Sequence, residues 1–518
     1  MKASHHVVAA GHESTAAAAE EVLREGGNAF DAAVAAMAAA CAAEPVLASP
    51  GGGGFMLACP AEGQARVYDF FVQTPRAPRA LDELDFYPIV ADFGTARQEF
   101  HIGRGTIAAP GFVAGMFAVQ RELSRMPLRE LVAPATALAR EGVPTTEFQS
   151  YLFSVVKPCF DATEECRAIF ASKLRDGSLV TPGEVLRQPE LADFLDVLAR
   201  EGEGLFYRGE VAARVAEDLR EGGQLDREDL EGYRVERRDP LSLEIAGARV
   251  LTNPPPSSGG VLAAFGLSLL ADGPLHGLDP QGAAFQVAVA GVLEATSRVR
   301  VEALARGEEL SRDALLDPVL LARYREQVLG RARASRGTTH ASVIDADGNL
   351  ASVTISNGEG SGYVVPGTGV VLNNMLGEED LNPGGFQRWP AGSRMTSMMM
   401  PCAVAWPDGT LLASGSGGSN RIRTALLQVL LQATVLGRAP EAAVMAPRLH
   451  LENGLLSVEG GFDAERIAPL LEAWPEHQVW EQRNMFFGGA HTVRTGPRIA
   501  DGVGDPRRAG VFRRVPAG

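Results

Sequence analysis

The most constraining feature of this sequence is a change of character at residue 338. Before it, the stretch 120–240 contains charged amphipathic segments such as 188–201 and 209–221, which are typical of helices outside a core. After it, apolar segments between tight turns predict strands at 339–345, 349–356, 369–373, 402–406 and 411–415. Helices and strands therefore do not alternate regularly. This arrangement favours helices packed outside stacked sheets over a βαβ array.

Caps, Gly/Pro signals and apolar patterning place the other elements. Residues 28–43 form an Ala/Val/Met segment that predicts a helix buried on most sides and ended by Pro45. Helices are also predicted at 15–25, 261–271, 421–436 and 463–473, with two or three more within 280–330. Further strands are predicted at 7–10, 55–57, 241–252, 455–459 and 490–495.

The size and charge of the chain limit its function class. Its 518 residues, 46% of them hydrophobic, exceed what one core usually organises, so two domains or one large layered domain are expected. The net charge is −16, and the 48 basic residues form no long block. These charges argue against nucleic acid or an anionic membrane as a partner. A small-molecule or peptide-like substrate fits better, and the sequence leaves a homodimer open.

The five cysteines show neither a CxxC pair nor a histidine at metal spacing, so we expect buried thiols and neither a metal nor a cofactor. The first residues never reach an apolar run of signal-peptide length. The Ala-rich stretch 32–43 is too short for a membrane span. A cytoplasmic location is the resulting expectation.

A Gly337-Thr338 bond opens a predicted strand deep inside the chain, after a polar stretch that carries Arg331, Arg333 and Arg336. Self-cleavage there would make Thr338 an N-terminal residue. Its hydroxyl is then a nucleophile, and its own α-amine, with an ordinary pKa of about 7.7–8.0, can accept the hydroxyl proton. The competing interpretation is a plain strand start beside a hairpin.

Other motifs allow both a chemical and a structural interpretation. Residues 415–421 join a strand to a helix, so their N–H groups could form an oxyanion hole, a phosphate cradle or only a structural turn. His340 is either a base or a satisfied core residue. The segment 378–380 is either a solvated loop or a specificity loop. Residues 51–54 precede a strand, which excludes a dinucleotide-binding loop.

Taken together, these segments resemble the γ-glutamyltranspeptidase family. The match runs in order through 25–35, 51–57, 110–115, 254–260, 338–340, 372–374, 396–398 and 415–421. The resemblance implies an α+β N-terminal nucleophile hydrolase fold, a four-layer αββα sandwich with two stacked antiparallel-rich sheets. It also implies a proenzyme cut into a large subunit, 1–337, and a small subunit, 338–518, which form one integrated catalytic domain.

The resemblance also assigns roles by position. Thr338 is the nucleophile, Ser356 supplies a hydroxyl to it or to its amine, and Asn357 falls at the site of the substrate amino group. Gly417 and Gly418 form the oxyanion pair, which an ungapped register shifts to Gly418 and Ser419. The remaining substrate-binding positions are Met375, Glu378, Thr396 and Ser397.

The departures from the family pattern concern the substrate. The family places an arginine for the α-carboxylate after an Asp-Phe pair, but here Asp69-Phe70 is followed by Phe71-Val72. Loss of a bidentate carboxylate partner removes a strong directional contact. Met375 stands where the family has glutamine and Glu378 where it has aspartate. The catalytic residues therefore look intact, whereas the pocket for a glutamate head group looks rebuilt.

Three hypotheses follow. The first is an autoprocessed threonine amidohydrolase for γ-glutamyl amides such as glutathione, acting by hydrolysis with transfer as a further outcome. The second keeps the mechanism but takes other acyl amides, as in the related cephalosporin acylases. The third is an unprocessed binding relic without activity.

Overall fold

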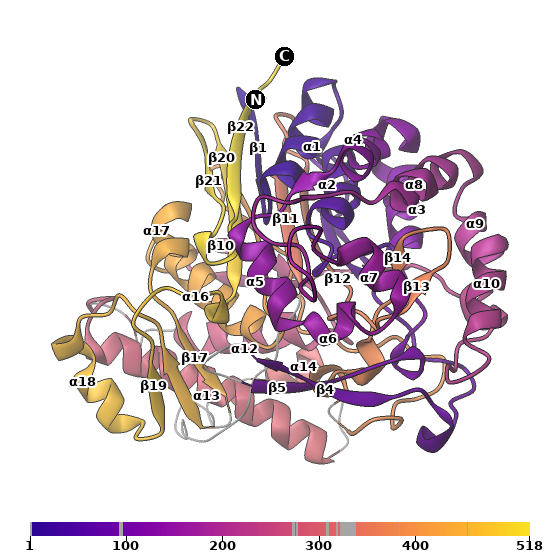
Figure 1. Ribbon diagram of the computed structural model, residues 1–518. Coiled ribbons are helices and arrows are strands. Elements are labelled where there is room, and N and C mark those ends of the chain that lie inside the picture. Colours follow the sequence, from indigo (N-terminus) through magenta and orange to yellow (C-terminus); the bar gives the residue numbers. More distant parts are fainter. Residues whose placement is uncertain are drawn as a thin grey trace.

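Two antiparallel sheets lie face to face at the centre of the molecule, with helices on their outer sides (Figure 1). The computed structural model describes residues 3–518 except 93–96, 272–274, 276–277, 307–309, 318–319, 322–337, 383 and 453. The first sheet has the order β22 (Val511–Pro516), β1 (His5–Ala10), β11 (Thr339–Ile344), β12 (Leu350–Ser356), β2 (Gly53–Cys59), β3 (Arg66–Phe70), β8 (Glu236–Arg238). The second has the order β21 (Ile499–Val503), β20 (Gly489–Gly496), β16 (Leu411–Gly417), β15 (Cys402–Ala405), β10 (Ala248–Thr252), β9 (Leu241–Ile245).

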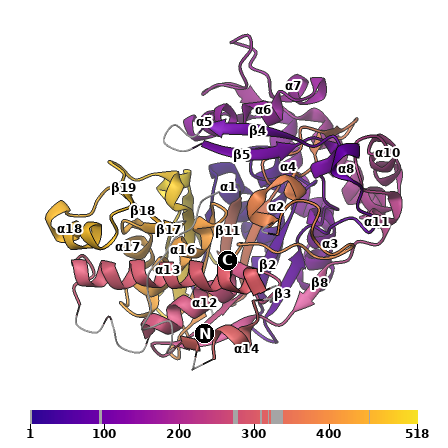
Figure 2. The same ribbon diagram turned by 90° about the horizontal axis from the view of Figure 1, so that it is seen from below.

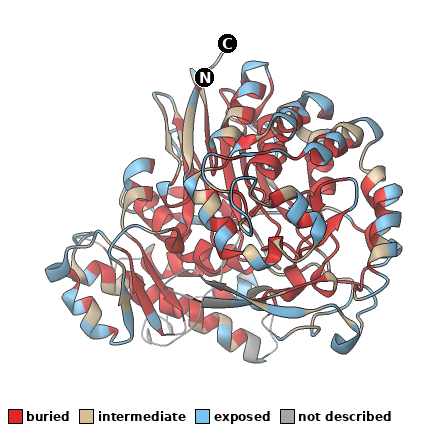
Figure 3. Cartoon of the chain, viewed as in Figure 1, coloured by how far each residue is buried: buried red, intermediate tan, exposed pale blue. Residues whose placement is uncertain are grey.

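Alternation along the strands separates two cores. In β1, Val7 and Ala9 belong to the core between the sheets, whereas Val8 and Ala10 pack on the helical side of the first sheet. This follows from the two-residue period of a strand, which sends successive side chains to opposite faces. Because both faces are covered, β1, β11 and β12 are buried almost throughout (Figure 3).

The helices form the outer layers. On the first sheet lie α1 (Glu13–Arg24), α2 (Ala29–Ala43), α3 (Phe112–Leu123), α4 (Leu128–Glu141) and α8 (Pro189–Glu201). The second sheet is covered by α12 (Ser258–Ala271), α13 (Ala283–Arg306) and α16 (Arg421–Thr434); α13 runs along the bottom of the molecule in Figure 1 and is seen beside α12 from below in Figure 2. All residues of α2 are buried, as its composition predicts, and a capping box between Asn28 and Asp31 starts it.

Short elements fill the periphery. The helices are α5 (Glu147–Val155), α6 (Lys157–Phe160), α7 (Glu164–Phe170), α9 (Gly204–Tyr207), α10 (Glu210–Asp218), α11 (Arg227–Glu231), α14 (Arg312–Leu315), α17 (Pro440–Met445) and α18 (Ala464–Ala473). The strands are β4 (Tyr87–Asp92), β5 (Arg97–Ile102), β6 (Val143–Pro144), β7 (Val185–Leu186), β13 (Val364–Val365), β14 (Val370–Val371), β17 (Leu449–Glu452), β18 (Leu455–Val458) and β19 (His477–Val479).

Two strand predictions need correction. The segment 241–252 is a hairpin rather than one strand, because Ala246 and Gly247 take positive φ angles of 49° and 79° and reverse the chain. The predicted strand 369–373 is only the two-residue β14, and the residues on either side of it lie in loops. Within 280–330, only α13 and α14 are assigned bounds, and part of that range lies outside the described residues.

The five cysteines are unpaired, and all but Cys59 are buried. Among the described helices, none combines the length and apolar character required to cross a bilayer.

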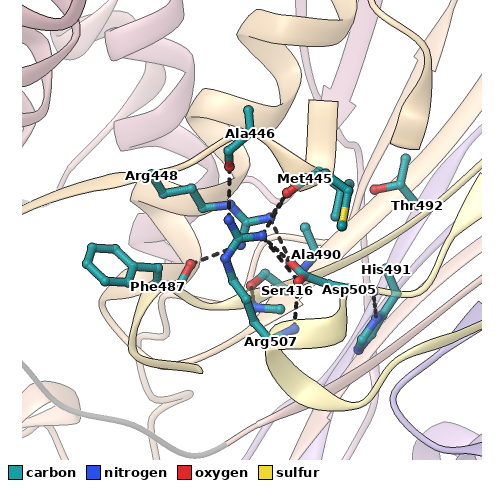
Figure 4. Close-up of polar contacts among 12 residues, drawn as sticks. Ser416, Met445, Ala446, Arg448, Phe487, Ala490, His491, Thr492, Asp505 and Arg507 are labelled. Atoms are coloured by element: carbon teal, nitrogen blue, oxygen red, sulfur yellow. Dashed lines mark hydrogen bonds and ion pairs between the residues drawn. The ribbon is translucent and has the colours of Figure 1, made fainter. Parts of the chain in front are cut away.

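A buried ion-pair network fixes the segment that leads into the last strand (Figure 4). Arg448 and Arg507 both contact the carboxylate of Asp505, at 2.7 Å and 3.3 Å, and Arg507 also pairs with Glu459. Asp505 additionally accepts the backbone N–H of Ala490 in β20. Burial alone would raise the pKa of Asp505, but these arginines and N–H donors outweigh it and lower the pKa to about 2. The network, which we call the Asp505 clamp, ties the second sheet to the C-terminal segment.

We expect Asp505→Asn to lower the melting temperature by several degrees, because it leaves the buried guanidinium of Arg448 without its carboxylate and removes one of the two carboxylates of Arg507, at a cost of about 3–5 kcal/mol. The ordinary pKa of 3.8 falls to about 2 in the folded protein, so the stabilisation is present above pH 4 and lost as the pH falls towards 2. Thermal unfolding at several pH values should therefore show the difference from wild type shrinking in acid. The exposed control Asp176→Asn should stay within about 0.5 kcal/mol. Equal melting temperatures for Asp505→Asn and wild type at pH 7 would contradict the clamp.

Candidate active site

Thr338 immediately precedes the central strand β11 and is only 2% exposed. Its carbonyl oxygen accepts a hydrogen bond of 3.3 Å from Nη1 of Arg508. Gly337 and the preceding residues 322–336, which include the arginines of the predicted junction, lie outside the described residues. The residue predicted to react is thus held at the edge where the two sheets meet.

A small cavity of about 20 Å³ brings together several of the residues predicted from the sequence. Thr338, Ser356, Met375, Glu378 and Ser397 all line it. The other lining residues are Phe71, Leu381, Met398, Met399, Ser419 and Ile422. The cavity therefore combines four hydroxyl side chains and one carboxyl group with six apolar side chains.

Four of the predicted residues, Asn357, Thr396, Gly417 and Gly418, are not in the lining of this cavity. Thr396 turns its hydroxyl away, towards Ser258 and the carbonyl of Pro256, each at 2.8 Å. Asn357 is buried, and its Oδ1 atom has no hydrogen-bond partner among the described residues. Gly417 lies against the backbone of Thr338, where a Cβ atom would come within 2.1 Å of the carbonyl oxygen.

The glycine turn after β16 leads directly to α16. Gly418 and Ser419 take positive φ angles of 119° and 46°, a conformation in which successive N–H groups can form an anion-binding concavity. The hydroxyl of Ser419 donates to Asp380 at 2.7 Å, and Ser419 is one of the residues that line the cavity. This arrangement puts the register Gly418–Ser419 nearer to the cavity than Gly417.

Ser356 owes its place to strand pairing. The antiparallel register joins Thr339 to Ile355, so the next residue, Ser356, comes opposite Thr338. Its Oγ atom accepts the N–H of Gly358 at 3.0 Å, and the residue is 3% exposed. The hydroxyl is therefore fixed at the C-terminal end of β12, beside the predicted nucleophile.

The acidic segment after Asn373-Asn374 is not a solvated loop. Asn373 donates to the carbonyls of Gly51 and Ala108, and Asn374 accepts the N–H of Glu359, which pins the chain beside the cavity. Glu378 is 4% exposed. Its burial, followed by the charges of Glu359 and Asp380, raises its pKa well above the ordinary 4.5.

Phe71 occupies the wall where the family pattern has an arginine. Its ring stacks on Phe55 with a centroid distance of 5.4 Å. Arg394, which no sequence motif marks, approaches the neighbouring Asp69 with 3.5 Å between its Nε atom and the carboxylate. The Arg394 guanidinium also donates to the carbonyl of Phe71 and to the hydroxyl of Tyr233. Arg394 is thus engaged beside the cavity and does not line it.

His340 is a satisfied core residue. Its two ring nitrogens pair with the hydroxyls of Ser342 and Thr354, both at 2.8 Å. Burial, and then the neighbouring His491, holds its pKa well below 6.5. Gly415 makes room for the ring, since a Cβ atom there would lie 2.1 Å from it. His340 therefore has no free nitrogen for Thr338, and the structure favours the core interpretation.

A larger cavity of about 370 Å³ adjoins the small one, and Leu381 lines both. Thr396 and Ser258 lie on its wall, together with Arg300, Arg388 and Trp389. It thus offers space on the far side of Thr396 for a part of a substrate that the small cavity cannot hold.

Comparisons with known proteins agree with this geometry. Residues 15–514 match the family model described as Gamma-glutamyltranspeptidase. The glutathione hydrolase proenzyme of Escherichia coli strain K12 is 29% identical over 501 residues, which cover 88% of this chain and 82% of that protein. The acylase ACY 1 proenzyme of Pseudomonas sp. strain V22 is 28% identical over 465 residues, with 86% and 79% coverage. The crystal structure of a cephalosporin acylase from Bacillus halodurans superposes with a TM-score of 0.81 at 25% identity and covers 99% of this chain and 96% of that one. The α+β sandwich predicted from the sequence is confirmed.

We expect Glu378→Gln to gain stability relative to wild type as the pH rises. A folded-state pKa above 4.5 means that the folded protein holds this proton more tightly, so wild-type stability falls as the pH rises from 4.5 through the folded pKa. Glutamine does not titrate and avoids this loss. Melting temperatures between pH 5 and pH 9 measure the difference. Glu379→Gln, at the exposed neighbouring position, is the control and should follow wild type throughout. A constant difference between Glu378→Gln and wild type would contradict the raised pKa.

Proposed function

Because the chain belongs to the gamma-glutamyltranspeptidase family and is an amidohydrolase of that family, we propose that it cleaves itself before Thr338 and then uses Thr338 as an N-terminal nucleophile. The observation that carries this proposal is the position of Thr338. It is buried at the start of the central strand, beside Ser356 and the glycine turn, and it lines the cavity. Both relatives named above are proenzymes, which supports a large subunit 1–337 and a small subunit 338–518.

The reaction would run in two steps. The Thr338 hydroxyl attacks the carbonyl carbon of an amide and passes its proton to the α-amine of the same residue. That proton then goes to the departing nitrogen, and an ester between the acyl group and Thr338 remains. Water attacks the ester, releases the acid and restores the hydroxyl. Ser356, opposite Thr338, orients the nucleophile, and the N–H groups of Gly418 and Ser419 face the developing oxyanion.

The cavity favours an acyl group without an α-carboxylate. None of its described lining residues is an arginine or a lysine, and Phe71, Met375 and Met398 contribute apolar side chains to its wall. Arg394, which lines the larger cavity, is engaged by Asp69, Tyr233 and backbone carbonyls. A carboxylate in the small cavity would therefore lose its hydration without gaining a cationic partner from the lining, which is unfavourable. Acyl amides without a carboxylate on the acyl chain therefore fit this cavity better than γ-glutamyl amides such as glutathione, and a glutaryl group, which keeps the terminal carboxylate, shares the same disadvantage.

Thr338→Ala should block both self-cleavage and hydrolysis, because no hydroxyl remains to attack. Denaturing electrophoresis and intact mass should show fragments 1–337 and 338–518 for wild type and one uncut chain for the variant. Thr338→Ser keeps a hydroxyl at the same place and serves as the matched control, which should still be cut. Cleavage that persists in Thr338→Ala would refute the assignment, and a wild-type chain that stays uncut on incubation would favour a binding relic.

Steady-state kinetics on two chromogenic anilides should separate the substrate classes. We expect kcat/KM for a γ-glutamyl anilide to exceed that for a butyryl anilide by less than about tenfold, because a bidentate arginine contact worth about 1.5–3 kcal/mol is missing. The butyryl group lacks both the α-amino group and the α-carboxylate of the γ-glutamyl group, and the two compounds share the leaving group, so the ratio reports recognition of the acyl part. A preference for the γ-glutamyl anilide of about 100-fold or more would sink the acylase assignment.

A further inference from the structure

Arg508 is a buried cation beside Thr338 that has no role in the reaction described so far. It is 3% exposed, and its Nη1 atom donates to the carbonyl oxygen of Thr338 at 3.3 Å. Its Nε and Nη2 atoms have no hydrogen-bond partner among the described residues. A buried guanidinium normally has carboxylate partners that satisfy its donors, as Arg507 has in the Asp505 clamp. Arg508 departs from this pattern, as the buried Arg423 also does, but unlike Arg423 it donates to the residue that is proposed to react.

Glycine residues make room for the side chain of Arg508 along its whole length. Gly489 leaves room for its aliphatic part, since a Cβ atom there would lie 2.5 Å from Cδ of Arg508. The guanidinium then reaches the glycine turn, where a Cβ atom at Gly417 would lie 3.0 Å from Nη1 and one at Gly418 would lie 3.2 Å from Nη2. Three glycines thus open a path to Thr338 that larger residues would close.

The Asp505 clamp fixes the base of the side chain. Arg507 and Arg508 are consecutive, yet Arg507 turns into the clamp, where Figure 4 shows it beside Asp505 and Arg448. Arg508 turns the other way, towards Thr338. The backbone N–H of Arg508 donates to the carbonyl of Asp505 at 3.1 Å, so the clamp and the cation are joined through one short turn.

We propose that Arg508 is a positioning residue that fixes the carbonyl of Thr338 and supplies the positive charge that keeps the adjacent α-amine in its neutral form. This inference rests on the proposed role of Thr338. The amine and the carbonyl belong to one residue, so the charge lies within roughly 7 Å of the amine. A cation at that distance in a buried site disfavours a second positive charge. Only the neutral amine can accept the hydroxyl proton.

The surrounding charges leave Arg508 protonated. Its burial lowers its pKa to about 10, which keeps the guanidinium charged at neutral pH. Three nearby carboxyl groups raise the pKa of Arg508 and so oppose the effect of burial; they belong to Glu359, Asp505 and Glu44. Two further titratable groups, Arg421 and His491, have pKa values that are lowered by burial, and both lie close enough for the charge of Arg508 to lower these pKa values further. Arg508 itself donates the hydrogen bond to the carbonyl oxygen of Thr338.

The test compares Arg508→Met and Arg508→Lys with wild type as full chains, with butyryl anilide as the probe. In Arg508→Met we expect kcat to fall by about 100-fold while KM changes by less than about threefold. The acid limb of the pH dependence of kcat/KM should move up by about one pH unit, because the amine regains its ordinary pKa. Arg508→Lys keeps the charge, so its acid limb should coincide with that of wild type and part of kcat should return.

Arg423→Met is the matched control for the loss of a buried arginine. Arg423 is 1% exposed and donates to Ser297 on α13, away from Thr338. This variant should lower the melting temperature without moving the acid limb. Arg508→Met with the acid limb and kcat of wild type would overturn the proposal.

Two further outcomes are decisive. If Arg508→Met folds but stays uncut, the proposal is supported, because self-cleavage needs the same hydroxyl in the same place. If it does not fold, the lysine variant decides, and an acid limb shifted upward in Arg508→Lys would overturn the role of the charge. The intact mass of wild type separates this proposal from the proposed function on which it rests. An uncut wild type refutes the role of Thr338 as nucleophile. A cut wild type whose Arg508 variants keep the wild-type kcat and acid limb refutes only the positioning role of Arg508.

Discussion

The close approach of the two sheets beside Thr338 is the constraint on which the rest of the site depends. Small polar residues make it possible, since Ser352 donates to the carbonyl of Ser414 and Ser342 donates to the carbonyl of His491, both at 3.0 Å across the sheets. Side chains of ordinary core size keep stacked sheets about 10 Å apart. Hydroxyl-to-backbone bonds instead bring β11 and β12 against β16 and β20. The glycine turn at the end of β16 thereby reaches the backbone of Thr338.

The sequence predicted the parts of the fold that follow from local pattern. The Ala-rich helix, the paired strands after Thr338 and the helix after the glycine turn all have a period or a cap that can be read directly. The hairpin at 241–252 is not predicted from the sequence, because Ala246 takes a positive φ angle that alanine rarely adopts. Asp505 and Arg508 act on residues far away in the chain, and only the folded structure brings them together.

The candidate site divides in the same way. Thr338, Ser356 and Glu378 were identified because they match ordered motifs, and the structure brings them to one cavity. The surroundings of Phe71 could not be read from motifs, because Arg394 arrives from a distant segment and is drawn to Asp69. The carboxyl group of Asp69 is 0% exposed and also pairs with Arg238 at 2.9 Å. Asp69 therefore engages both of these nearby arginines, Arg238 and Arg394. What the cavity can recognise therefore depends on which cations are already engaged, and sequence spacing does not report that.

The strand order also bears on what a cut before Thr338 would do to the molecule. In the first sheet, β11 lies between β1 from the proposed large subunit and β12 from the proposed small one, and β12 lies against β2 from the proposed large subunit. In the second sheet, β15 from the small subunit pairs with β10 from the large one. Each sheet is thus built from both subunits, and their separation would break rows of buried backbone hydrogen bonds. The new N-terminus would stay held between β1 and β12, so the same interleaving that hides Thr338 in the intact chain would keep it in place as a nucleophile after the cut.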